Sequence, residues 1–92
     1  MSEQETTAAI LAVSGNYAVV RLPDRQYPAL AVQGDSLKVL QEAVEEMAEN
    51  LGLGDLKEAG FSLREIRSTV SSMLSTYESV SRETGFDLPY VR

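Results

Sequence analysis

The feature that most constrains the fold is a proline-marked segment that leads directly into an acidic helix, LPDRQYPALAVQGDSL at residues 22–37. Pro28 cannot donate to a sheet ladder, so a strand either begins there or turns that position outward. Gly34 breaks the strand, and Asp35 or Ser36 can accept hydrogen bonds from the first free amides of a helix. The segment therefore predicts a strand over residues 27–33 followed at once by a helix.

Two further strands precede this segment. Residues 8–14 are small, apolar and partly β-branched, and the Gly15-Asn16 dipeptide after them suits a tight hairpin turn because both residues tolerate positive φ. Residues 17–22 form a second strand with imperfect alternation. Pro23 and Asp24 predict a type I turn into the third strand. Residues 8–33 are thus expected to form a three-stranded antiparallel meander.

Two amphipathic helices are expected after the meander, at residues 35–51 and 62–84, because apolar residues recur there at spacings of three and four. The apolar stripes are Leu37, Leu40, Val44, Met47 and Leu51 in the first helix, and Leu63, Ile66, Val70, Met73, Tyr77 and Val80 in the second. The first stripe is expected to cover the sheet. Asn50 and Gly52 should end the first helix in a left-handed cap, and Gly85 should end the second.

The start of the second helix carries the clearest local signal. Ser62-Leu63-Arg64-Glu65 has the form of a capping box, and Phe61 before it could pack on Ile66 as a hydrophobic staple. The whole chain, residues 1–92, is predicted to be a single α+β domain of βββαα order with tails at 1–7 and 86–92. Phe86, Leu88 and Tyr90 of the second tail could fold back onto the core.

The composition disfavours several classes of function. The chain has no cysteine and no histidine, so it lacks thiolate nucleophiles, disulfides, the usual general base and the commonest metal ligand. Its net charge of −6 argues against binding nucleic acid. It has neither a long apolar run nor a signal-like N-terminus. We expect a cytoplasmic protein that is not an enzyme, binds no metal or cofactor, and contacts neither nucleic acid nor membrane.

The first candidate binding surface is an acidic stripe on the first helix, which we call the glutamate face. Its members are Glu42, Glu45, Glu46 and Glu49. Residues three and four apart are neighbours on a helix, so these carboxylates repel one another, and a basic partner would relieve that repulsion. The alternative is that the stripe is only a solvated helix surface.

The second candidate surface is the hairpin loop Asp24–Tyr27. Arg25 and Tyr27 are residue types favoured as binding anchors, and loops on rigid hairpins often carry recognition. The alternative is that Asp24 and Arg25 only make the turn. A third feature, the series of serines and threonines along the second helix, could allow close packing or polar contact with a partner, or could be solvated surface.

Residues 17–47 carry a resemblance to a known family. The string YAVVRLPD at residues 17–24, then PALAVQGDSL at residues 28–37 and a helix rich in alanine and glutamate, is similar to the core of HicB-type antitoxins. It also resembles short bacterial proteins associated with toxin-immunity loci. In HicB-type proteins the domain masks a small ribonuclease toxin, and a DNA-binding segment usually follows the core. Residues 61–92 here do not resemble that segment.

These observations lead to a functional expectation with one rival. The resemblance implies an immunity protein or antitoxin that neutralises a basic toxin domain, such as a nuclease, by covering its active surface. Within it, the glutamate face would steer association and Arg25 and Tyr27 would give specific contact. The rival is a structural module that forms a homodimer through the apolar and hydroxyl-rich surface of the second helix.

Overall fold

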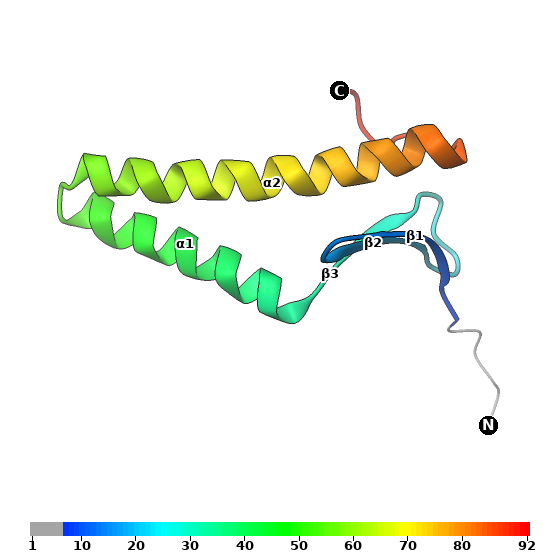
Figure 1. The fold of residues 1–92 in the computed structure, drawn as a ribbon, viewed down its shortest axis with the longest axis horizontal. Helices are drawn as coiled ribbons and strands as arrows, with labels where there is room; N and C mark the ends of the chain where they lie inside the picture. The colour runs from blue at the N-terminus through cyan, green and yellow to red at the C-terminus, as the bar shows by residue number, and fades with distance from the viewer. Residues whose placement is uncertain (1–6) are drawn as a thin grey trace. The chain divides into compact units, whose positions relative to one another are not determined.

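The computed structural model describes residues 7–92 and confirms the α+β fold (Figure 1). Three antiparallel strands are followed by two helices, in the predicted order. The elements are β1 (Ala9–Ser14), β2 (Tyr17–Arg21), β3 (Ala29–Val32), α1 (Gly34–Gly52) and α2 (Leu56–Thr84).

The sheet is a meander with the spatial order β1-β2-β3. β1 and β2 are joined by the predicted tight turn, in which Gly15 has a φ of 58°. The register of β1 against β2 shifts between Ile10 and Ala12, which makes Leu11 the extra residue of a β-bulge. β1 and β3 are the edge strands.

The turn after β2 differs from the prediction. Asp24 has a φ of 61°, whereas the second central residue of a type I turn has a negative φ. Positive φ at that position, after a proline, belongs to the type II family, and aspartate is one of the few residues that tolerate it. β3 begins only at Ala29, because Pro28 before it has no amide to donate.

By its internal packing the chain divides into two compact units. The first, which we call the sheet unit, holds the three strands together with Ser75–Arg92. The second, which we call the hairpin unit, is Gln33–Leu74 and contains α1 and the first part of α2. Each unit has its own small set of buried residues.

Tyr77 is the centre of the sheet unit. It is buried with Val19 and Val80, and Val19 has no exposed surface at all. The Tyr77 hydroxyl donates a buried hydrogen bond of 2.6 Å to the carbonyl oxygen of Pro28. This bond fixes the entry to β3 against the end of α2, and partly buried Leu11, Ala12 and Leu30 of the sheet pack around the cluster.

The C-terminal tail folds back onto this cluster, as predicted. Gly85 ends α2 with a φ of 85°, and the Ser81 hydroxyl donates a 2.5 Å hydrogen bond to the carbonyl oxygen of Phe86. The Phe86 ring meets Tyr77 edge-on with centroids 5.3 Å apart, and the Tyr90 ring stacks on Tyr77 at 6.4 Å. The tail thus supplies part of the core of the sheet unit.

The start of α1 also differs from the prediction. The helix begins at Gly34, and its N-cap residue Gln33 makes no side-chain capping bond. Asp35 Oδ1 accepts from the adjacent Ser36 amide at 2.8 Å, within the first turn rather than from outside it. At the other end Leu53 is right-handed, and the left-handed residue is Gly54, with a φ of 76°. The predicted left-handed cap at Asn50 or Gly52 is therefore wrong by two residues or more.

α2 starts well before the predicted capping box. Asp55 Oδ1 accepts the Glu58 amide at 3.1 Å, which is the bond of an N-cap to the third helical residue, and the helix begins at Leu56. Ser62 lies inside the helix, is 4% exposed, and donates at 3.3 Å to Glu46 Oε1 of α1. The predicted capping box at Ser62 is therefore wrong, and the N-cap is Asp55, seven residues earlier.

We expect Tyr77→Phe to lower the free energy of unfolding by about 1–2 kcal/mol, because the buried Pro28 carbonyl loses its donor while the ring is kept. Tyr17→Phe is the matched control, since the hydroxyl of the half-buried Tyr17 makes no such bond within residues 7–92, and it should change stability by less than about 0.5 kcal/mol. Urea unfolding followed by circular dichroism measures both. Equal losses in the two variants would contradict the role of the Tyr77 bond.

A second pair of variants tests where α2 begins. Asp55→Ala should cost about 1 kcal/mol by removing the cap. Ser62→Ala should cost less than about 0.5 kcal/mol, because alanine's higher helix propensity offsets the loss of a long hydrogen bond. Thermal unfolding of the two variants gives the comparison. A loss of less than about 0.3 kcal/mol for Asp55→Ala would contradict its role as the N-cap.

Candidate functional site

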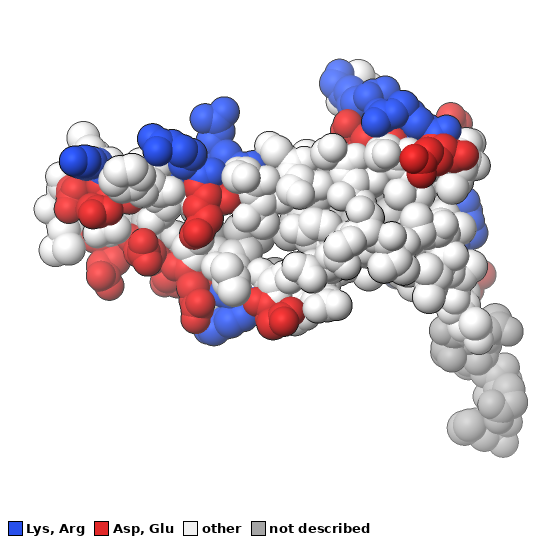
Figure 2. Space-filling model, viewed as in Figure 1, with Lys and Arg blue, Asp and Glu red and all other residues white. Residues whose placement is uncertain are grey.

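The structure places all four members of the glutamate face in the exposed part of α1, within the hairpin unit. Figure 2 shows acidic side chains gathered over α1. Glu46 accepts the hydrogen bond from Ser62, and among residues 7–92 none of the four glutamates forms an ion pair. Glu45, Glu46 and Glu49 also line an open depression on this surface.

Basic residues of the hairpin unit lie on α2 rather than on α1, apart from Lys38. Lys57, Arg64 and Arg67 are all exposed. The Arg64 guanidinium carbon lies 5.3 Å from the centroid of the Phe61 ring, in a cation–π contact. Phe61 is therefore a platform for Arg64 at the surface, where the sequence had suggested a hydrophobic staple. The charges of α2 leave the glutamate face unneutralised.

The loop residues Asp24, Arg25 and Tyr27 lie in the sheet unit and are exposed. Asp24 sits at the positive-φ position of the turn, which gives it a local structural role. Tyr27 is 38% exposed, yet it lies close enough to Tyr77 to help raise the pKa of that residue. The glutamate face and this loop thus belong to different units of the chain.

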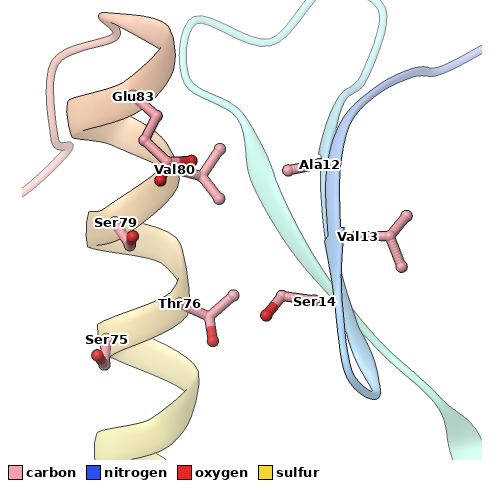
Figure 3. Close-up of a pocket in the computed structure, with 8 residues that line it drawn as sticks. All are labelled: Ala12, Val13, Ser14, Ser75, Thr76, Ser79, Val80 and Glu83. Atoms are coloured by element: carbon pink, nitrogen blue, oxygen red, sulfur yellow. The ribbon is translucent and has the colours of Figure 1, made fainter.

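The structure adds a depression that sequence reasoning missed, between β1 and the last part of α2 (Figure 3). It is open, has a volume of about 400 Å³, and is lined largely by hydroxyl groups. Ala12 and Ser14 point toward the helix, where Thr76 and Val80 face them, while Val13 points away. The only sequence signal for it was the series of serines and threonines in α2.

This depression lacks the groups that hydroxyl chemistry needs. Besides its hydroxyls it offers one carboxylate, Glu83, and no basic side chain. A serine or threonine becomes a nucleophile only beside a general base such as histidine or lysine. Residues 7–92 also contain no group of three or more carboxylates, histidines or cysteines placed to hold a metal ion. Neither α1 nor α2 is long and apolar enough to cross a membrane.

Two tyrosines of the sheet unit have a raised pKa. Burial raises the pKa of Tyr77, and the nearby positive charge of Arg21 opposes part of that rise. Partial burial also raises the pKa of Tyr90, together with its 3.0 Å hydrogen bond to Glu78 Oε2. Both shifts favour the neutral phenol, which suits donors in a packed core rather than catalytic bases.

Comparison with known proteins gives one match. A family model described as a family of unknown function (DUF6959) matches residues 3–90 of the chain. No curated protein and no solved structure matches it.

The raised pKa of Tyr77 predicts a loss of stability in alkali. A group with a folded-state pKa above its unfolded value contributes its stability fully below the unfolded pKa, about 10 for tyrosine, and loses it as pH rises further. We therefore expect the free energy of unfolding to fall as the pH rises above about 10. The fall should be smaller in Tyr77→Phe, which lacks one of the two tyrosines with a raised pKa. Some fall should remain, because the pKa of Tyr90 is raised too. Equal falls in both proteins would contradict this.

Proposed function

Since this chain belongs to DUF6959, a family of unknown function, we propose its role from its own surfaces: a non-enzymatic protein that binds a basic protein domain through the glutamate face. The observation that supports this is a set of four exposed carboxylates on one helix without a cationic partner among the described residues. Their mutual repulsion disfavours the free helix, so contact with lysine or arginine side chains stabilises the complex.

In its more specific form, the proposal is that the partner is a toxin domain with a basic active surface, of the nuclease type, in the bacterial cytoplasm. The resemblance of residues 17–47 to the HicB-type core supports this form. Masking would be steric and electrostatic: carboxylates occupy the positive surface that the substrate phosphates would otherwise contact. The chain would act as an immunity protein or antitoxin without DNA binding of its own.

The loop Asp24–Tyr27 is the proposed second contact. Arg25 is exposed, and Tyr27 combines an exposed ring with a position close to Tyr77. A tyrosine has only two side-chain torsions to fix, so it loses little conformational freedom when a partner buries it, and such residues often dominate interface energies. In this arrangement the glutamates govern how fast the partner associates, and the loop governs how slowly it leaves.

The test uses the protein encoded by the gene next to this one, which the proposal expects to be a basic toxin domain, and measures its binding to the full chain by surface plasmon resonance. Glu45→Lys/Glu49→Lys should lower the association rate at 50 mM salt at least about tenfold, since steering depends on this local charge. Glu83→Lys/Asp87→Lys is the matched control, because it changes the net charge equally in the sheet unit, and it should lower the rate by less than about threefold.

Two results would count against this function. Equal effects of the two double variants would show that only net charge matters and that the glutamate face is not the contact. Growth of cells that co-express the toxin provides the second readout: the wild-type chain should restore growth, and the glutamate variant should restore it less. A wild-type chain that neither binds nor protects would overturn the proposal as a whole.

A further inference from the structure

The apolar stripes of the two helices do not coincide with the surfaces that the helices bury. In the hairpin unit the less exposed residues recur at alternating spacings of four and three. On α1 they are Ser36, Leu40, Ala43, Met47 and Asn50, and on α2 they are Ala59, Ser62, Ile66, Thr69 and Met73, with Gly60 as the one exception to the spacing. This spacing is typical of the seam along which two helices face each other, although only Ala43, Ala59 and Ser62 are buried. More than half of the seam consists of small or polar residues.

A second apolar line follows directly beside this seam and is left open to solvent. We call it the apolar face. Its members are Leu37, Val44 and Leu51 on α1 and Leu56, Leu63 and Val70 on α2. Each is between 41% and 73% exposed, although all six are aliphatic. Five of the six were predicted as helix stripe residues, and the structure shows that the hairpin does not bury them.

Helix geometry places the six residues on the same side of the hairpin. Each line repeats every seven residues and follows the seam by one position, about 100° around its helix. When two helices run antiparallel, the line of residues just after the seam on one helix lies next to the corresponding line on the other helix, on the same side of the pair. Glu46 comes one residue before the seam residue Met47, so it lies on the other side of the seam from the apolar face. The Ser62–Glu46 hydrogen bond is therefore on that other side. The six residues of the apolar face therefore lie on one side of the hairpin, and the two lines come closest near the turn that joins α1 and α2 (Figure 1).

We propose that this face binds a second copy of the chain, so that two hairpins pack as a four-helix bundle with α1 of each copy over α2 of the other. A second copy fits the apolar face because a two-fold rotation places the aliphatic face of one copy against the identical face of the other. Packing of four amphipathic helices in this way buries residues that one hairpin leaves exposed.

The charges of the two helices favour this occupant and this orientation. α1 carries five carboxylates and one lysine, whereas the first part of α2, residues 56–74, carries three basic residues and two acidic ones. Stacking α1 on α1 would bring like charges together. Stacking α1 of one copy on α2 of the other brings the acidic residues of α1 opposite the basic residues of α2, including Lys57 and Arg67. Since the chain has a net charge of −6, a face without carboxylates is also where two copies repel each other least.

The length of the face suits packing against a second hairpin. α1 has 19 residues and is about 28 Å long at about 1.5 Å per residue. Leu37, Val44 and Leu51 are spread along this length, so a second hairpin aligned with the first can cover all three together.

The experiment is sedimentation equilibrium of the purified full chain and of matched valine variants. The wild-type chain should sediment at twice its mass of 10.1 kDa at micromolar concentration. Val44→Lys, on the apolar face, should raise the dimer dissociation constant at least about tenfold. Val39→Lys is the control: Val39 is 58% exposed on the same helix but points about 140° away from Val44, and its dissociation constant should change less than about twofold.

A second variant and a folding check keep the test decisive. Leu63→Lys should weaken the dimer as Val44→Lys does, and far-ultraviolet circular dichroism should show native helix content in every variant used. A wild-type chain that remains monomeric at about 100 μM would overturn the proposal. So would a dimer that survives both lysine substitutions, or one that Val39→Lys disrupts equally.

Cross-linking tests the orientation of the two copies. The chain has no cysteine, so only introduced thiols can react. A mixture of Val44→Cys and Leu63→Cys chains should oxidise to the mixed cross-linked dimer faster than Val44→Cys does alone, since α1 lies over the partner's α2. Faster linkage of Val44→Cys to itself would overturn this orientation. The dimer does not rest on toxin binding, so sedimentation can fail while partner binding succeeds, and the reverse.

Discussion

The hydrogen bond from Tyr77 to the carbonyl of Pro28 is the interaction on which the sheet unit depends. Three short strands are stabilised when their hydrophobic face packs against a helix, and a buried carbonyl without a donor costs about 1–3 kcal/mol. Tyr77 meets both needs, because its ring is the centre of the core and its hydroxyl satisfies the backbone at the entry to β3. Phe86 and Tyr90 then pack on the same ring, so the tail is ordered by the residue that orders the sheet.

In the hairpin unit, small residues rather than large apolar ones occupy the buried positions. Ala43, Ala59 and Ser62 are its buried residues, so the surface that each helix turns inward is not its most apolar one. Because the buried line and the apolar line of each helix differ, an aliphatic surface stays exposed on one side of the hairpin. The carboxylates of the glutamate face lie on a different side of α1. One short helix thereby carries two chemically different surfaces, and the proposals for a basic partner and for a second copy use one each.

Much of the fold followed from local patterns in the sequence, and the errors have physical causes. The Gly15-Asn16 turn, the order of the elements, the end of α2 at Gly85 and the return of the tail were predictable, because glycine position and apolar spacing report on local conformation. The start of α2 was not predictable, because Ser62-x-x-Glu65 has the form of a capping box while Ser62 lies inside the helix, buried and hydrogen-bonded to Glu46 of α1. The glutamates were correctly placed on an exposed surface. The hydroxyl-lined depression could not be foreseen, because it brings together Ser14 and Thr76, which are 62 residues apart in the chain.

The discontinuity of the sheet unit affects how the chain is made on the ribosome. The strands are synthesised first, but Tyr77, Val80 and the tail that complete their core emerge only after the whole hairpin unit. The intervening hairpin is contiguous and rich in local contacts, so it can form during translation. Until the last part of α2 emerges, the nascent strands have no helix to cover the side of the sheet that carries Val19 and Leu30. Emergence of residues 75–92 is thus the earliest moment at which this side of the sheet can be buried.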